Sequence, residues 1–492
     1  MNVGIILLLL FAAMFIMIGL LVSKKSKSDS ADDFLVAGRS VPPAFVAASV
    51  VVSWTWVSTI MGAGEAGTLY GVSGGLNYAW GAAVPFFLFV PMALRIKKLL
   101  PNCTTFVEFI EIRYGKKMSG LYLIFGIALC FYILMSQAVG IGVVFRSIFG
   151  LPYIVGMLVP MAIIIIYIAS VGLRGAIIND VIQFFIITII LIITIPLIIR
   201  ALGLGNIYNG LVSVATDSGN AYYNPEALSI NSYSGFQYGL AAVVVAFGQV
   251  LLDQGYYSKA VAIANNKSML KTYILATVLT WVPIPIIAGN FFGTSYIGLW
   301  EKLGLPEIAT GSEAAATILK YVFGGGIGSI CFVFMVFMAA MTTAGNSLSG
   351  AQALLSVNLY KGFIKKDATD KEQLRFGRIA TVVLGVIVAV VALFLANVSL
   401  LTLDIFSGIL FSAPVSGFFA GLFLKKPNEK ICLISVILGW VGAVVIWFTA
   451  PNSQDAMFYG NMGALLIPVA VLVIGSLFAK RNFNFDTMSY DA

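Results

Sequence analysis

Residues Ala44–Leu69 read AFVAASVVVSWTWVSTIMGAGEAGTL, an apolar run long enough to cross roughly 30 Å of hydrocarbon as a helix. The segment Ser53–Trp56 interrupts the run, and Gly62, Gly64 and Glu65 follow it. A broken helix exposes carbonyl and amide groups that lipid cannot bond, so a break is tolerated where those groups face an ion, a solute or protein. The stretch therefore predicts a binding site, although membrane helices also use such glycines only for close packing.

A second break is expected five apolar runs later, in Phe236–Tyr256, where Gly248-Gln249 precedes Asp253-Gln254-Gly255. An inverted repeat of five helices produces this spacing, because the first helix of each half is then interrupted at a corresponding place. The predicted organisation begins with a peripheral helix and a cytoplasmic loop (1–43) and a first five-helix repeat (44–200). An extracellular loop (201–235) and a second, inverted repeat (236–424) follow. Two peripheral helices and a short cytoplasmic tail (425–492) come last.

The composition of the whole chain supports a membrane protein. Of its 492 residues 60% are hydrophobic and 10% are charged, and a soluble domain of that composition would expose a large apolar surface to water. We therefore predict an all-α membrane protein with thirteen transmembrane helices. The expected spans are Val3–Val22, Ala44–Leu69, Ser73–Leu94, Leu121–Phe145, Pro152–Ser170, Ala176–Ile199, Phe236–Tyr256, Thr272–Phe292, Gly326–Asn358, Ile379–Ala396, Leu401–Leu424, Ile431–Phe448 and Gly463–Phe478.

The distribution of basic residues predicts an orientation. Of the 29 Lys and Arg residues, 25 fall in one set of alternate loops, Lys259 among them. The opposite loops hold only Arg146, Arg200, Lys302 and Lys320. The positive-inside rule then places the amino terminus outside and the carboxyl terminus in the cytoplasm of a multi-pass protein of the cell membrane. This alternation argues against a nucleic-acid partner, despite the formal charge of +8.

The absence of certain residue types and motifs from the sequence excludes several functions. The chain has no histidine, which removes His metal sites and Ser-His-Asp hydrolysis, and it has no GxxxxGK[ST] loop for ATP. Its four cysteines lie in spans or in a cytoplasmic loop, where disulfides are not expected. We expect a transporter rather than an enzyme, without a cofactor other than a coupling ion.

Adjacent threonines in the ninth span indicate a possible cation site. The run Ala339-Ala340-Met341-Thr342-Thr343 combines two hydroxyls with helix carbonyls, which are the hard oxygen ligands that a small alkali cation needs. The alternative is that each threonine bonds only to its own helix, as threonines in membrane helices often do.

Four carboxylates are expected within or at the edge of the bilayer, where they are costly and mark functional sites: Glu65, Asp180, Asp253 and Asp404. Asp253 is the favoured solute ligand, because Gln249, Asp253 and Tyr256 would share one face of a continuous helix. The alternative for Asp253 is a structural hydrogen bond within the protein.

At these residues the sequence resembles the sodium/solute symporter family over nearly its whole length. The features of this resemblance are Asp32-Asp33-Phe34, Gly172-Leu173-Arg174 followed by Asn179-Asp180, and the Ala-Ala-Met-Thr-Thr run ending in Leu359-Tyr360-Lys361. Within the family the chain looks most like the urea and polyamine transporter branch, on the evidence of Ser53–Trp56, Tyr70–Gly74, Arg113-Tyr114-Gly115 and Asp253 with Gly255-Tyr256.

The resemblance implies a leucine-transporter-type fold with a 5+5 inverted repeat and a discontinuous first helix in each repeat. It also implies a sodium site made of backbone oxygens and two hydroxyls, from Val52, Thr55, Ala339, Thr342 and Thr343. Asp180 looks like a family aspartate on the sodium exit route. The chain departs from the family at Asn358, where an aspartate is usual, and some urea transporters lack a match to Asp180.

We therefore expect a sodium-coupled symporter that imports a small polar solute, urea-like or otherwise nitrogenous, by alternating access. Amides, hydroxyls and a carboxylate can bond such a solute while an indole closes its cavity. The candidate solute ligands are Trp54, Ser58, Asn77, Gln249, Asp253 and Tyr256. Proton coupling through Asp180 and Asp253, a passive channel for the same solute, and a receptor without transport are the alternatives.

Overall fold

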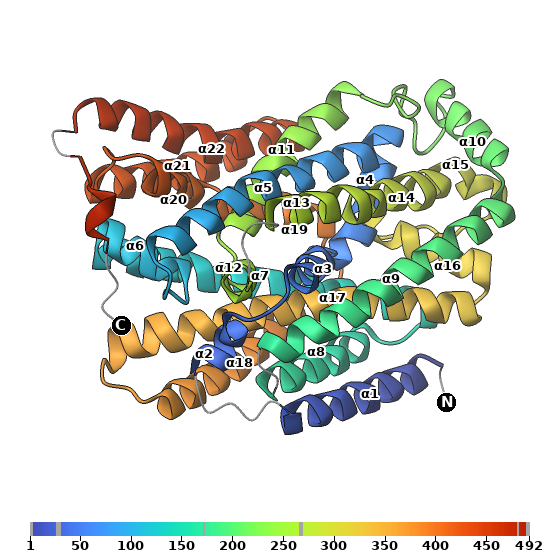
Figure 1. Cartoon of the computed structure of the whole chain (residues 1–492). Coiled ribbons are helices and arrows are strands. Elements are labelled where there is room, and N and C mark those ends of the chain that lie inside the picture. The colour runs from blue at the N-terminus through green and yellow to red at the C-terminus, as the bar shows by residue number, and fades with distance from the viewer. Residues whose placement is uncertain (1–2, 26–30, 171–172, 265–268, 480–481, 489–492) are drawn as a thin grey trace.

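The computed structural model describes residues 3–25, 31–170, 173–264, 269–479 and 482–488 (Figure 1). These residues form a bundle of helices without a β-strand, and the one isolated β-bridge among them joins Val41 to Ile263. The all-α prediction is therefore confirmed for the described part of the chain. Gly172, one of the residues of the family resemblance, lies outside it.

In the first half of the chain, helix α6 begins at a sequence signal that supplies hydrogen bonds missing at a helix end. The Thr105 hydroxyl accepts from the Glu108 amide at 3.3 Å, and the Glu108 carboxylate accepts from the Thr105 amide at 2.6 Å. The elements are α1 (Val3–Lys25), α2 (Ala31–Val36), η1 (Ala37–Arg39), α3 (Pro43–Ser53), α4 (Val57–Tyr70), α5 (Val72–Leu99), α6 (Phe106–Tyr114), α7 (Lys116–Phe149), α8 (Tyr153–Ser170), α9 (Leu173–Leu202) and α10 (Leu204–Thr216).

The second half contains shorter pieces and π-helical turns between its long helices. Its elements are α11 (Tyr233–Leu251), α12 (Gln254–Ala262), α13 (Met269–Ala276), η2 (Thr277–Trp281), α14 (Pro283–Ile287), η3 (Ala288–Gly293), α15 (Thr294–Leu303), η4 (Gly311–Glu313), α16 (Ala314–Phe323), α17 (Ile327–Ala353), η5 (Leu354–Ile364), α18 (Asp370–Ala392), α19 (Leu400–Phe411), α20 (Ala413–Phe423), α21 (Glu429–Thr449), α22 (Ser453–Leu477) and η6 (Phe485–Thr487).

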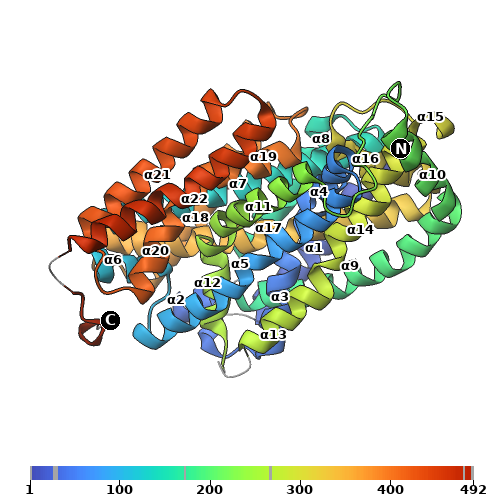
Figure 2. The same cartoon turned by 90° about the horizontal axis from the view of Figure 1, so that it is seen from above.

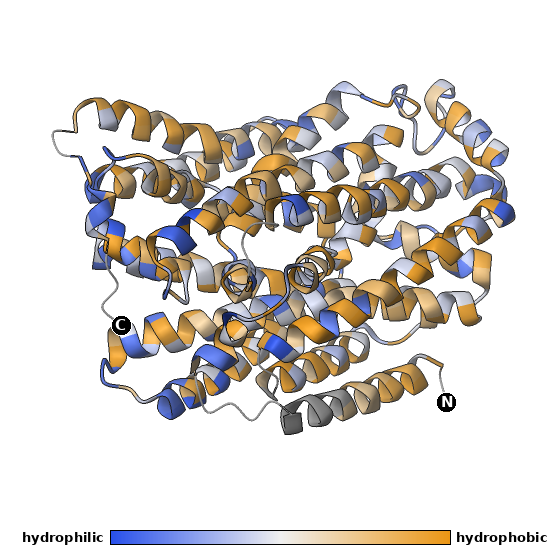
Figure 3. Cartoon of the chain, in the orientation of Figure 1, coloured by the Kyte–Doolittle hydropathy of each residue, from blue (hydrophilic) through white to orange (hydrophobic). Residues whose placement is uncertain are grey.

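Each of the thirteen apolar runs contains a helix, and Figure 3 shows apolar residues along most of the helix bodies. Within the described residues nine helices are long and apolar enough to cross a membrane, or up to eleven if each of two bent pairs is one span. The pairs are α3–α4 and α19–α20, bent by 47° and 49°. Apolar helices shorter than this length occur at Val3–Phe15 and Tyr153–Ala169. The count of thirteen crossings stays a prediction.

The two predicted helix breaks are confirmed. Helix α3 ends at Ser53 and α4 begins at Val57, while α11 ends at Leu251 and α12 begins at Gln254. The short helices α3 and α12 lie near the middle of the bundle in Figure 1. At the edges α1 packs on α8, and α21 packs on α22; Figure 2 shows the latter pair side by side from above. Both breaks therefore lie inside the protein.

The glycines after the first break serve close packing. A Cβ on Gly67 would collide with the backbone of Gly289, and a Cβ on Gly293 would collide with the backbone of Gly64. Helix α4 therefore packs backbone to backbone against η3, as small residues allow in membrane proteins. The packing interpretation thus holds for Gly67 and Gly293. A Cβ on Gly64 itself would meet no atom nearer than 3.6 Å, and Trp54, Thr55 and Trp56 form the break.

Candidate functional site

The end of α3 meets the two threonines of α17. The Thr342 hydroxyl lies 3.0 Å from the carbonyl oxygens of both Val52 and Ala339, and the Thr343 hydroxyl lies 3.0 Å from the carbonyl oxygen of Ser53. All of these side chains are buried. Both threonines thus bond to the end of α3. The alternative, in which each threonine bonds only to its own helix, does not describe these contacts.

Thr55 lies in the break beside this group. Its amide donates to the Val52 carbonyl at 3.0 Å, and its hydroxyl donates to the Val51 carbonyl at 3.1 Å. The structure therefore brings the hydroxyls of the two threonines together with the Val52 and Ala339 carbonyls, and Thr55 joins them through its amide. Ser53, whose carbonyl bonds Thr343, was missed, although its position next to Val52 at the helix end could have indicated it. Hydroxyl and carbonyl oxygens suit a hard alkali cation.

A buried ion pair lies directly beside these oxygens. Lys259 Nζ is 3.0 Å from Asp180 Oδ2 and 2.6 Å from the Ser53 hydroxyl, and the Ser49 hydroxyl donates to Asp180 at 2.6 Å. The charged side chains are 0% and 6% exposed. The pair therefore connects α12 to α3 and α9.

The sequence analysis placed Lys259 in a polar loop, and that placement is wrong. Lys259 lies in α12, where all residues from Gln254 to Ala262 are buried. A basic residue is expected in a loop by the positive-inside rule, but an intramembrane carboxylate such as Asp180 requires a partner. The aromatic and small neighbours Tyr256, Tyr257 and Ala260 were the available signal, because they are unlike a solvated loop.

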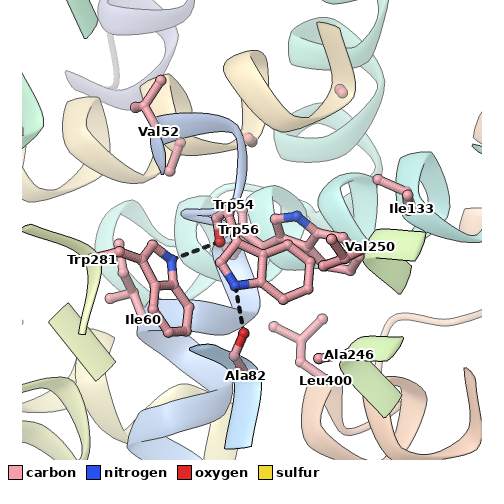
Figure 4. Close-up of a cluster of buried hydrophobic side chains, with 14 of the residues drawn as sticks. Val52, Trp54, Trp56, Ile60, Ala82, Ile133, Ala246, Val250, Trp281 and Leu400 are labelled. Atoms are coloured by element: carbon pink, nitrogen blue, oxygen red, sulfur yellow. Dashed lines mark hydrogen bonds between the residues drawn. The ribbon is translucent and has the colours of Figure 1, made fainter. Parts of the chain in front are cut away.

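A small cavity lies on the other side of the first break. It is narrow, with about 390 Å³ of space between its atoms in all, and its lining includes Trp54, Trp56 and Trp281. Figure 4 shows these indoles together. Trp54 Nε1 donates to the Ala82 carbonyl at 3.1 Å, and Trp281 Nε1 donates to the Trp54 carbonyl at 2.9 Å. Hydrogen bonds thus fix two of the rings in the cavity wall.

Asp404 supplies the carboxylate of this cavity. The Tyr132 hydroxyl donates to Asp404 Oδ1 at 2.6 Å, and the Tyr78 hydroxyl lies 3.5 Å from Oδ2. Gln249 also lines the cavity, and its Nε2 lies 2.8 Å from the Ser407 hydroxyl. Asp404 was recognised as an intramembrane carboxylate but was left out of the predicted solute ligands, since its partner Tyr132 lies 272 residues away in the chain.

The predicted solute ligands do not all meet at the cavity. Trp54 and Gln249 line it, whereas Asn77, Asp253 and Tyr256 do not. Ser58 is buried beside Tyr78 and Asp404, near the cavity but outside its lining. Asn77 bonds the Ser73 hydroxyl at 2.7 Å and Trp80 Nε1 at 2.8 Å instead.

The prediction that Gln249, Asp253 and Tyr256 share one continuous helix face is wrong, because α11 ends at Leu251. Asp253 caps the next helix: its Oδ1 accepts from the Gly255 amide at 2.8 Å, and its Oδ2 accepts from Asn346 Nδ2 at 2.9 Å. The structural alternative for Asp253 therefore describes its contacts.

Glu65 is the fourth intramembrane carboxylate, and it joins three elements. It accepts from the Ser312 hydroxyl of η4 and from the Leu401 amide of α19 at 3.3 Å. The beginning of α19 is thereby capped by a carboxylate, which the helix dipole favours.

A larger cavity, with about 1460 Å³ of empty space, borders the cavity lined by Trp54. Leu401 and Ile405 of α19 line both. Tyr70 of the larger cavity stacks on Tyr238 of the smaller one, with 5.0 Å between ring centres. A thin wall of these four side chains thus separates the two spaces.

Comparisons with known proteins agree with this architecture. A model of the sodium:solute symporter family matches residues 34–439. A probable urea active transporter of Schizosaccharomyces pombe is 27% identical, with 97% of this chain and 76% of the relative covered. The urea-proton symporter of Oryza sativa subsp. japonica is 26% identical, with 92% and 67% covered. A solved Na⁺-coupled sialic acid symporter, in a substrate-bound outward-open state, shares the fold with a TM-score of 0.75 at 18% identity, covering 97% of this chain and 98% of its own.

Proposed function

This chain belongs to the sodium:solute symporter family, and on that basis we propose that it uses a sodium gradient to import a small polar nitrogenous solute such as urea. It is a multi-pass membrane transporter and not an enzyme. The observation that carries the proposal is that one broken helix serves both sites. Val52 and Ser53 bond the threonines of α17, and the next residue, Trp54, lines the solute cavity.

In the proposed cycle sodium binds first, to backbone oxygens of Val52, Thr55 and Ala339 and to the hydroxyls of Thr342 and Thr343. The hydroxyls bond carbonyls of the broken helix, so a cation at this position fixes the break against α17. A fixed break holds Trp54 in the wall of the cavity and prepares it for the solute. By linkage the solute tightens sodium binding by the same factor.

The driving force is sufficient without ATP. One sodium ion that crosses about 100 mV down a tenfold gradient releases roughly 3.7 kcal/mol. That free energy supports an accumulation of a neutral solute of about 500-fold.

Alternating access then needs a gate on each side of the solute. The wall of Leu401, Ile405, Tyr70 and Tyr238 is suited to the outer gate, because Leu401 and Ile405 line both cavities and the stacked tyrosines line one each. Asp180 would lie on the route by which sodium leaves toward the cytoplasm, since its partner Lys259 contacts Ser53 beside the proposed sodium ligands.

The proposal includes thirteen crossings of the cell membrane in a leucine-transporter-type arrangement. Residues 44–200 and 236–424 would form the two inverted repeats, with the amino terminus outside and the carboxyl terminus in the cytoplasm. The two helix breaks at corresponding positions support this assignment.

Proton coupling is the second candidate. It is favoured by the buried Asp180–Lys259 pair, through which a proton could pass, and by the printed name of the Oryza relative. A passive channel is a weaker candidate, because a channel has no need of threonines bonded across a helix break.

Uptake of labelled urea into proteoliposomes tests the coupling. We expect uptake driven by an inward sodium gradient at equal pH on both sides, and no accumulation when choline replaces sodium. Uptake driven by a proton gradient in choline would establish the second candidate. Uptake that only equilibrates the solute, whatever the gradient, would identify a channel and contradict symport.

A further inference from the structure

Asp404 is a buried carboxylate without a cationic partner. Its side chain is in the wall of the solute cavity, and the residue is 6% exposed. Among the described residues the recorded ion pairs involve other carboxylates, and none of the residues that line the cavity is Lys or Arg. Its recorded partners are neutral groups, namely the hydroxyls of Tyr132 and Tyr78 and, close by, Ser58 and Gln249. Glu65 and Asp253 also have only neutral recorded hydrogen-bond partners, but of these three carboxylates only Asp404 lines the cavity, where a positively charged solute can reach it.

The aromatic walls add a second attraction for positive charge. Trp54, Trp56 and Trp281 line the cavity with Tyr78 and Tyr238. The electron-rich faces of indole and phenol rings attract cations, and indole does so most strongly. A carboxylate surrounded by such rings favours a positively charged solute over a neutral one of the same shape.

The hydrogen-bonding groups of the cavity favour a solute that donates. Trp54 Nε1 and Trp281 Nε1 both donate to backbone carbonyls, and Gln249 Nε2 donates to Ser407. The hydroxyl of Thr59 donates to the Trp54 carbonyl at 3.2 Å. These donors are already used. Trp56 Nε1 is the exception among the indole and amide donors of the described lining, because it is buried without a recorded partner and can bond a carbonyl. The carboxylate of Asp404 is an acceptor for a solute that donates. The carbonyl of urea needs a donor from the protein, but a guanidinium ion has only N–H donors.

We infer that the specificity-determining residue of this site is Asp404 and that it selects a planar guanidinium- or amidinium-type cation over neutral urea. The inference rests on the proposed function, which assigns this cavity to the solute. Guanidinium and urea have the same planar shape and the same number of heavy atoms. They differ in charge, and guanidinium has a third N–H donor group where urea has its carbonyl acceptor. A charge-assisted hydrogen bond to Asp404 would therefore give guanidinium a higher affinity than urea, although the two molecules match in size and shape.

Competition for uptake tests the inference in proteoliposomes with a clamped membrane potential. Unlabelled guanidinium and unlabelled urea, both at concentrations far below those that denature proteins, compete against labelled urea in a sodium gradient. For the parent chain we expect guanidinium to inhibit at a concentration about tenfold or more below that of urea, as a charged hydrogen bond implies. Asp404→Asn should lower this ratio about tenfold, and Asp404→Glu should largely keep it.

The control is Asp367→Asn, an exposed carboxylate in the loop before α18, which should leave the ratio unchanged. Stabilisation of each variant by guanidinium chloride in a thermal-shift assay reports binding without transport, so a variant with impaired transport still gives a result. Equal or stronger inhibition by urea in the parent chain would overturn the inference, as would an unchanged ratio in Asp404→Asn. Either outcome leaves sodium-driven uptake intact, whereas uptake that ignores sodium would contradict the proposed function itself.

Discussion

Replacing both Thr342 and Thr343 with alanine should abolish sodium-dependent uptake. Each hydroxyl bonds a carbonyl at the end of α3, and in the proposed cycle each also contacts the ion. A hydrogen-bonding contact to a charged group contributes about 1.5–3 kcal/mol. Losing two should therefore weaken sodium binding by about 100-fold or more. Uptake of labelled urea as a function of sodium concentration measures this change.

Two control variants distinguish the loss of sodium ligands from a general effect of replacing threonine in a membrane helix. Thr342→Ser with Thr343→Ser keeps both hydroxyls and should retain sodium dependence. Thr188→Ala removes a hydroxyl that bonds only to the Phe184 carbonyl of its own helix, at 2.8 Å, and should leave sodium dependence unchanged. Full sodium-dependent uptake by the double alanine variant would exclude these threonines as ligands.

Lys259→Met should destabilise the protein strongly and stop transport. The substitution leaves the Asp180 carboxylate buried beside the Ser49 and Ser53 hydroxyls and without its cation. Removing one partner of a buried ion pair costs about 3–5 kcal/mol, because the remaining charge is uncompensated. Thermal unfolding of the purified protein in detergent measures this loss against Lys117→Met, which removes an exposed lysine.

The double variant Lys259→Met with Asp180→Asn tests whether the lost stability comes from the unpaired charge or from the altered shape of the side chains. It removes both charges, so most of the lost stability should return, as replacements of whole buried pairs show. Transport should stay low if the pair takes part in sodium release. A single Lys259→Met variant as stable as the parent chain would show that the pair contributes little to the fold.

The sequence predicted the local features of this fold well. Apolar runs located the long helices, and the glycine and polar interruptions located both breaks, because each signal depends on neighbouring residues. The adjacency of Thr342 and Thr343 likewise indicated a group of oxygens, although their contact with Val52 and Ser53 spans 290 residues. The resemblance supplied that long-range pairing.

Contacts between distant helices account for what the sequence analysis missed. The solute carboxylate was assigned to Asp253 by assuming an unbroken helix, while the break that had been predicted in the same run turns Asp253 toward Asn346. Asp404 becomes the carboxylate of the cavity only through Tyr132 and Tyr78, which come from other helices. Lys259 was assigned to a loop since a single basic residue gives no sign of a distant partner.

The central claim is that sodium and solute bind cooperatively through the broken helix. Its most direct test is the affinity of the purified protein for labelled urea, or for guanidinium if that binds better, in sodium and in choline. We predict an affinity about 5- to 150-fold higher in sodium, the usual range of coupling between sites. The solute should raise the affinity for sodium by the same factor. Equal solute affinity in sodium and choline would contradict sodium coupling.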